Sequence, residues 1–160
     1  APVGVMGSHQ VVTTTGAAQI AGNLSAGDAG TAGSVGTLAF NNGVTLATGS
    51  TSTFDFSNPS LASGTFDLVT SDGGDTASFD GSLVLNFTGG AYADNSSVKI
   101  FDFAAYSGNF SSVTALGLSD GQQASFDSTT GFVTISAPEP SMMGLCAAAG
   151  LLELRRRRAH

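Results

Sequence analysis

Hydrophobic residues in the first 136 positions recur at every second residue over many short stretches. Residues 83–87 alternate in this way, and Asp55 and Asp102 each stand between two phenylalanines. A period of two sends successive side chains to opposite faces of a β-strand, so the apolar ones are expected to face a core and the two aspartates to face solvent. No stretch of helix length in this region carries an apolar stripe with a period of 3.6 residues. The pattern predicts an all-β body.

Turn-forming residues separate these stretches at short spacing. Asn42-Gly43 is a typical tight-turn pair, and residues 23–34 are rich in Gly, Ala, Ser and Asp, which predicts turns rather than strands there. We treat residues 1–34 as weakly structured or as a partial β repeat, followed by a β-rich body over residues 35–136. Strands are expected at residues 10–14, 18–21, 36–40, 44–46, 51–56, 64–69, 81–87, 98–103, 124–127 and 132–135.

Three stretches of the body open alike, with a glycine, a hydroxyl residue and an apolar residue. These openings begin at Gly36, Gly64 and Gly81, at spacings of 28 and 17 residues, so any repeat is degenerate. Corners of Gly, Asn and Ser around small or aliphatic side chains are typical of a β-helix. We therefore expect a β-helix or solenoid, with a β-sandwich of about eight strands as the alternative.

A different pattern covers residues 137–160. After a Pro-Glu-Pro tripeptide, residues 141–154 form an apolar run interrupted near its end by Glu153. The run predicts a short hydrophobic helix of about 21 Å, at roughly 1.5 Å per residue, which is less than a hydrocarbon core near 30 Å. Such a length favours transient membrane retention over a permanent anchor. The run is closed by a block of cations, Arg155, Arg156, Arg157 and Arg158.

This order of elements is a stop-transfer arrangement. The apolar run partitions into lipid, whereas the guanidinium groups stay on the cytoplasmic side, so everything before Pro138 is expected to lie outside the cytoplasmic membrane. The chain begins with Ala1 and no secretion signal opens it. We therefore expect it to be the C-terminal piece of a longer or processed precursor.

Charge is distributed unevenly between the body and the tail. The net charge of −7 combines ten Asp and the single Lys99 in residues 1–137 with four Arg and two Glu in residues 138–160. A body so acidic has almost no cations to replace the counterions of a phosphate backbone. Nucleic-acid binding is therefore not expected.

The body also offers few residues for catalysis. Residues 1–137 hold one histidine, His9, and neither Cys nor Glu, and the chain has no Trp. A Cys–His pair and a histidine-based metal site therefore lack partners, and a glycosidase pair would lack the usual aromatic cleft. Cys146 lies in the apolar run, where a small apolar role is the simplest interpretation. We expect no enzyme activity and no organic cofactor.

One turn of the body is a candidate cation site. Asp72 and Asp75 flank a Gly-Gly pair, and carboxylate and carbonyl oxygens are the ligands that Ca²⁺ prefers. The spacing matches neither an EF-hand loop nor a calcium-binding nonapeptide repeat. An acidic turn without an ion is the simpler interpretation.

The tail resembles the PEP-CTERM sorting signal of Gram-negative bacteria. Pro138, Glu139 and Pro140 correspond to its recognition tripeptide, and the apolar run and arginines follow in the family's order. The resemblance implies export, transient retention in the inner membrane, and processing by an exosortase. Delivery to the cell surface or extracellular polymer matrix would follow.

The body, from about residue 22 to residue 136, resembles more loosely the C-terminal part of autotransporter-associated β-strand repeat proteins. Residues 22–28 are similar to that family's G-x-L-x-P-G-N turn, with Ala26 in place of Pro, and residues 66–69 are similar to its Y-D-x-L strand. The resemblance implies a β-helical surface passenger or stalk without an active site.

These observations support one main hypothesis, an exported structural protein of the bacterial surface or matrix. Its expected partners are the membrane and an exosortase-type enzyme. Two alternatives remain: a carbohydrate-binding or adhesive module that recognises extracellular polysaccharide, and the C-terminal stalk of a larger surface hydrolase.

Overall fold

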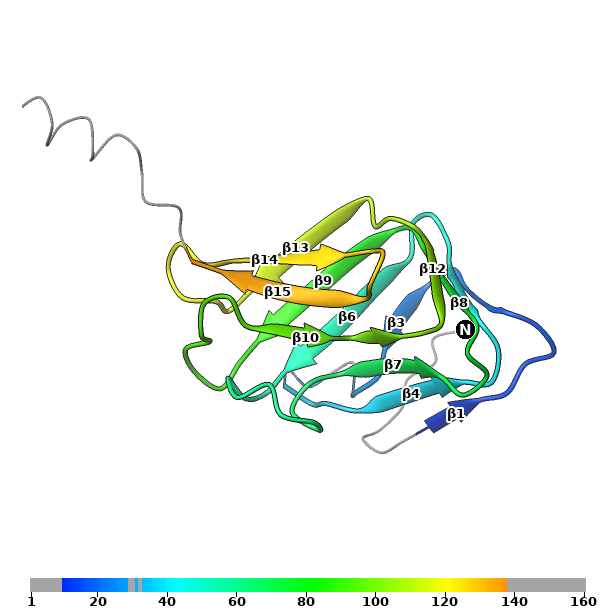
Figure 1. Ribbon diagram of the computed structural model, residues 1–160, viewed down its shortest axis with the longest axis horizontal. Coiled ribbons are helices and arrows are strands. Elements are labelled where there is room, and N and C mark those ends of the chain that lie inside the picture. Colours follow the sequence, from blue (N-terminus) through cyan, green and yellow to red (C-terminus); the bar gives the residue numbers. More distant parts are fainter. Residues whose placement is uncertain (1–9, 29–30, 32, 138–160) are drawn as a thin grey trace, which may run out of the picture.

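The computed structural model describes residues 10–28, 31 and 33–137, and these residues contain β-strands and turns but no helix. Their chain winds into a stack of short parallel strands, a β-solenoid of about three turns (Figure 1). The expectation of an all-β solenoid is thus confirmed, and the sandwich alternative is wrong. The short helix expected at residues 141–154 lies outside the described residues.

Successive passes of the chain contribute one strand each to three parallel sheets of four strands, so that three full turns separate the first strand of a sheet from its fourth. Sheet A contains β1 (Gln10–Val12), β4 (Thr37–Phe40), β7 (Leu68–Ser71) and β11 (Phe101–Asp102). Sheet B contains β2 (Ala18–Ile20), β5 (Val44–Leu46), β8 (Thr76–Phe79) and β12 (Ala105–Gly108). Sheet C contains β3 (Asn23–Ser25), β6 (Thr51–Phe56), β9 (Ser82–Phe87) and β13 (Ser112–Leu116).

The repeat is about one solenoid turn long. In sheet C, Thr51 pairs with Ser82 and Ser82 pairs with Ser112, so equivalent positions recur after 31 and 30 residues. The openings at Gly36 and Gly64 therefore come from successive turns, whereas Gly81 opens another strand of the same turn as Gly64. The corners between strands differ in length, so the period is hard to see in the sequence. Stacking requires that strands of successive turns stay in register, and it does not require equal numbers of residues per turn.

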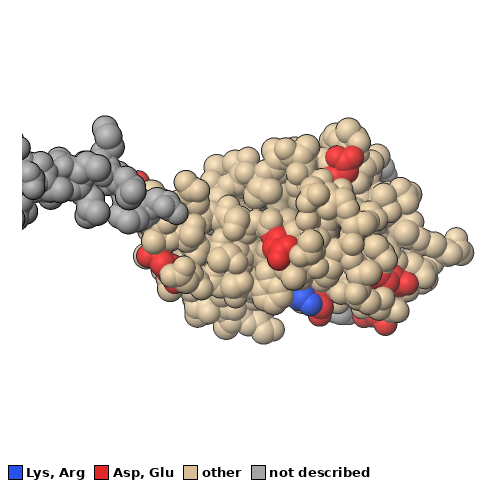
Figure 2. Space-filling view, turned by 45° about the horizontal axis from the view of Figure 1, so that its top comes forward, with Lys and Arg blue, Asp and Glu red and all other residues tan. Residues whose placement is uncertain are grey.

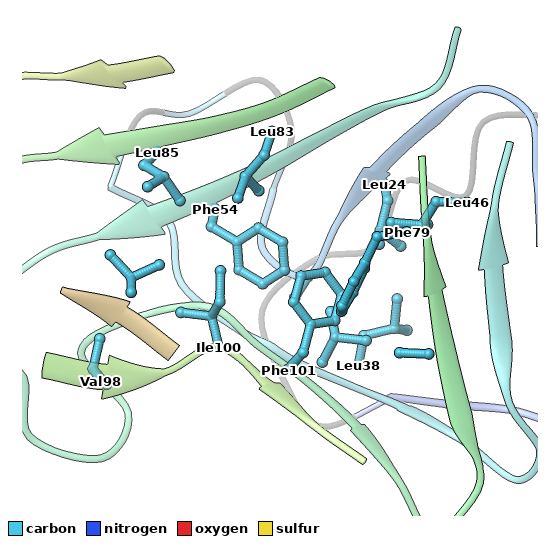
Figure 3. Close-up of a cluster of buried hydrophobic side chains, with 14 of the residues drawn as sticks. Leu24, Leu38, Leu46, Phe54, Phe79, Leu83, Leu85, Val98, Ile100 and Phe101 are labelled. Atoms are coloured by element: carbon cyan, nitrogen blue, oxygen red, sulfur yellow. The ribbon is translucent and has the colours of Figure 1, made fainter. Parts of the chain in front are cut away.

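Side chains that point inward stack in ladders from turn to turn. In sheet A, Leu38 pairs with Val69 and Val69 with Phe101, and all three are buried. Phe101 lies 4.9 Å from both Phe54 and Phe79, measured between ring centroids, at the centre of this core (Figure 3). Burying each such side chain contributes about 1.5–3 kcal/mol. The ladders therefore stabilise the stack.

An antiparallel sheet covers the end of the last turn. In sheet D, β15 (Phe132–Ser136) pairs with β10 (Ser97–Lys99) on one side and β14 (Gln123–Asp127) on the other. Val133 and Ile135 are each 1% exposed, and the ring of Phe126 lies 5.8 Å from that of Phe101. The hairpin thus packs on the core at the last turn of the solenoid.

Several strands differ from the sequence expectation. Residues 23–25 form β3 and not a turn, because their pairing with β6 outweighs their small, polar composition. Ile100 divides the stretch 98–103 into β10 and β11, since the first part pairs antiparallel in sheet D and the second parallel in sheet A. The strands β8, β12 and β13 gave no clear signal, since their side chains are mostly small.

The alternation expected for residues 83–87 is confirmed, because Leu83, Leu85 and Phe87 are buried while Val84 and Asn86 are only partly buried. Asp102 is solvated as expected, with 57% of its side chain exposed. The same expectation is wrong for Asp55, which is 4% exposed. The chain between β6 and β7 returns beside the end of β6, where Phe56 and Phe66 form an antiparallel bridge and the N–H of Asp67 donates to the carbonyl of Asp55.

Candidate functional site

The most unusual chemical group in the described part of the chain is a buried pair of aspartates. Asp67 is fully buried and Asp55 nearly so, and they are the only charged residues buried among the described ones. Asp55 lies on β6, and Asp67 ends the loop that returns from β6 to β7. The backbone N–H of Asp67 donates to the carbonyl of Asp55 at 2.9 Å, which brings the two residues together.

Both carboxylate oxygens of Asp67 accept hydrogen bonds from the backbone. The N–H of Gly36 donates to Oδ1 at 2.7 Å and the N–H of Asp55 donates to Oδ2 at 2.9 Å. The side-chain amide of Asn86 on β9 donates to Oδ1 of Asp55 at 3.0 Å. We call Gly36, Asp55, Asp67 and Asn86 the Asp67 corner. Through these hydrogen bonds the corner connects the start of β4, the strand β6 and the strand β9 of the next solenoid turn.

Burial, with a smaller effect of the neighbouring Asp55 carboxylate, raises the pKa of the Asp67 carboxyl to about 7, against the two backbone N–H groups that lower it. A strongly shifted carboxyl can mark a catalytic acid. Here both oxygens are occupied by main-chain donors, so this geometry favours a structural latch. The sequence signalled Asp67 only weakly, because its place between Phe66 and Leu68 resembles that of the solvated Asp102.

The candidate cation turn holds its two aspartates differently. Asp72 is exposed, whereas Oδ2 of Asp75 accepts a hydrogen bond from the Ser71 hydroxyl at 3.2 Å. Among residues 10–28, 31 and 33–137, no group of three or more His, Cys, Asp or Glu side chains is placed to hold a metal ion. A calcium ion at Asp72 and Asp75 stays a prediction from sequence.

Aromatic side chains that could meet a sugar are few on the described surface. Tyr92 is buried, and its hydroxyl lies 2.9 Å from the carbonyl of Phe56. Tyr106 is half-buried and donates to the carbonyl of Phe101. Phe132 is 37% exposed, and Nζ of Lys99 lies 5.8 Å from its ring centroid. Phe132 and Lys99 therefore place an exposed aromatic ring beside a cation on the described surface.

Lys99 also forms an ion pair with Asp102 at 2.9 Å, and this hydrogen bond raises the pKa of the Lys99 ammonium. Figure 2 shows a face made mostly of uncharged residues, on which acidic side chains are scattered and one basic side chain lies beside an acidic one. No strongly charged patch covers this face.

The residues predicted to direct sorting lie outside the described residues. These are Pro138, Glu139, Pro140 and the arginines 155–158, and His9 and Cys146 lie outside them as well. In the part of the chain that the structure describes, no helix combines the length and hydropathy needed to cross a membrane.

No family model, curated protein or solved structure matches this chain. The two family resemblances therefore stand on the sequence motifs alone.

Proposed function

We propose that this chain is an exported structural protein of the cell surface or extracellular matrix of a Gram-negative bacterium. The observation that carries the proposal is the order of three elements at residues 138–158, a rigid Pro-Glu-Pro, an apolar run and an arginine block. In this arrangement Arg155–Arg158 halt translocation and residues 141–154 hold the chain in the membrane. The tripeptide is the segment that an exosortase-type enzyme recognises, since proline restricts the backbone dihedral φ and lowers the cost of ordering the segment on binding.

The solenoid body supports a structural role. Its surface is rich in hydroxyl groups that pair from turn to turn, as between Ser78 and Ser107 at 2.8 Å and between Ser112 and Ser82 at 3.0 Å. A stack of this kind needs only its neighbouring turns for stability, and its polar, acidic surface keeps it hydrated outside the cell. In this proposal the tail is a cleavable sorting signal, and the solenoid body is the structural part that it delivers.

The test is expression, behind a secretion signal, in a Gram-negative host with and without an exosortase. Deletion of residues 138–160 is expected to abolish inner-membrane retention and to change surface delivery. Replacing Pro138 and Pro140 by Ala should leave retention intact but prevent processing, seen as an unprocessed band in the membrane fraction. The matched control is Asp102→Asn on the solvated body surface.

Unchanged retention and delivery after removal of residues 138–160 would contradict the proposal. Processing that is indifferent to both the prolines and the exosortase would contradict the role of the tripeptide alone.

Polysaccharide binding is a second candidate, favoured by the exposed Phe132 beside Lys99 and Asp102. An aromatic ring with flanking charged groups can stack on a sugar and hydrogen-bond its hydroxyls. Binding to a glycan panel that disappears in Phe132→Ala, but not in Val11→Ala, would support this function. If no glycan of the panel binds, this second function is contradicted and the structural role stands as the proposal.

A further inference from the structure

The last described strand ends almost directly before the tripeptide of the proposed sorting signal. β15 extends to Ser136, and only Ala137 separates it from Pro138. The four residues 137–140, between β15 and the apolar run, span at most about 14 Å even when fully extended. A small folded domain is about 30 Å across. The solenoid body therefore leaves too little room for another domain to enclose the tripeptide between the body and the apolar run.

β15 is held in sheet D as far as its last residues. The N–H of Ile135 donates to the carbonyl of Ser96 at 2.9 Å, and the N–H of Asn95 donates to the carbonyl of Ile135 at 2.8 Å. On the other side of β15, Ser136 lies directly opposite Gln123 of β14 (Figure 1). Ile135 is 1% exposed. Release of this end of β15 therefore breaks main-chain hydrogen bonds and exposes a buried side chain.

The length of β15 matches the room that an enzyme would need. Proteolysis of a folded chain proceeds through local opening, because an enzyme that cleaves a peptide binds it in an extended form. Release of β15 adds its five residues to the four that precede the apolar run. The resulting segment reaches up to about 30 Å, which is the width of a small domain. Detachment of β15 thus provides the space that the folded body denies.

We propose that β15 acts as a brake on processing at Pro138-Glu139-Pro140. A processing enzyme reaches the tripeptide only after the C-terminal end of β15 has left sheet D, so the rate of processing follows the population of this opened state. The inference rests on the proposed function, since it takes residues 138–140 as the segment that an exosortase-type enzyme recognises. A folded body is therefore processed slowly, and an unfolded body quickly.

The first test changes the distance between the body and the tripeptide. A flexible spacer of about ten Gly and Ser residues is inserted between Ala137 and Pro138. Pulse–chase labelling in a Gram-negative host that expresses an exosortase should show processing that is faster by roughly tenfold or more. The same spacer between Ala62 and Ser63, in an exposed turn before β7, is the matched control and should leave the rate unchanged.

The second test fixes the strand in place. In a Cys146→Ser background, Gln123→Cys with Ser136→Cys puts two thiols on exposed, directly opposed residues. Opposed Cβ atoms in an antiparallel pair lie about 4.5–5.5 Å apart, so mild oxidation should join the thiols. Their disulfide should slow processing in isolated membranes by roughly tenfold or more, and dithiothreitol should restore the rate. In the chain with the spacer after Ala137 the disulfide should have no effect, because the tripeptide is then accessible while β15 stays in the sheet.

Equal rates with and without the spacer after Ala137 overturn the inference, and so does a disulfide that slows both chains equally. In these two cases processing still depends on the exosortase, so the proposed function stands. Absence of exosortase-dependent processing in every chain contradicts the proposed function, and the inference with it. Far-ultraviolet circular dichroism that matches the wild type shows that the variants are folded.

Discussion

At the scale of single residues, the Asp67 corner shows how one carboxylate can organise several segments. Asp67 accepts two main-chain hydrogen bonds and is fully buried. Hydrogen bonds to an ionised group are stronger than neutral ones, whereas burial opposes ionisation. The hydrogen bonds of the Asp67 corner therefore stabilise the fold, whereas burial of the ionised Asp67 carboxylate destabilises it. The net effect on stability depends on pH, because pH sets whether Asp67 is ionised.

Burial raises the pKa of Asp67 to about 7, from the usual 3.8. Between about pH 4 and pH 7 the folded state holds a proton that the unfolded state has lost, so stability falls as the pH rises through this window. The loss is at most about 4 kcal/mol, and it is complete above pH 7. Asp67→Asn should remove this dependence, so that denaturant unfolding at pH 5 and pH 8 gives nearly equal free energies.

Two other carboxylates, those of Asp80 and Asp127, have lowered pKa values, so their effect on stability has the opposite pH dependence. The Thr48 hydroxyl lowers the pKa of Asp80, and the Thr129 hydroxyl lowers that of Asp127. The stability that these two groups contribute is present above about pH 4 and is lost on further acidification. Asp72→Asn is the control for the Asp67 variant. Equal pH slopes for Asp67→Asn and the wild type would show that Asp67 does not carry the effect.

At the scale of elements, the corners between strands decide how closely successive turns stack. Gly81 stands just before β9 with φ +74°, and an added Cβ would lie 2.3 Å from the carbonyl oxygen of Ser50. That carbonyl accepts the hydrogen bond of Ser82 from the next turn. Gly49, in the corner before β6, has a similar φ of +84° but nothing within 4 Å of an added Cβ.

The two glycines separate backbone strain from steric contact. Gly49→Ala is expected to cost about 1–2 kcal/mol, because an L-residue is strained at positive φ. Gly81→Ala adds a clash with backbone that cannot move without breaking the stack, and should cost about 3 kcal/mol or more. Urea denaturation of both variants measures the difference. Equal losses would mean that the corner at Gly81 relaxes freely.

At the scale of the whole molecule, a single core joins the solenoid turns to the antiparallel hairpin. Phe101 contacts Phe54 and Phe79 within the solenoid and Phe126 on β14 of the hairpin. Since the same ring packs against both parts, the described body is expected to unfold as one cooperative unit.

Phe101→Ala tests this continuity. It should destabilise the protein by about 3–5 kcal/mol through lost burial and a cavity, with one transition throughout. Phe132→Ala removes a ring that is 37% exposed and is expected to cost under about 1 kcal/mol. Two separate transitions by circular dichroism and Tyr fluorescence in the Phe101 variant would show that the hairpin and solenoid fold independently.

Sequence reasoning predicted the all-β class, the solenoid and the inward-facing side chains of β6 and β9, because a period of two is a local property of a strand. The proposed sorting signal also follows from local order alone. Strands of small residues, such as β8 and β13, were not predicted. Their apolar and polar side chains differ little in size and hydrophobicity, and pairing with neighbouring strands is what makes them strands.

Only the tertiary structure decided which outward-facing residues remain in water. Asp55 and Asp102 have the same local pattern, yet Asp55 is 4% exposed whereas 57% of the Asp102 side chain is exposed. Likewise, Val113 and Leu83 are both apolar residues that face inward, but only Leu83 has a strand on either side. Periodicity determines the direction in which a side chain points, whereas the stacking of distant turns determines what it meets there.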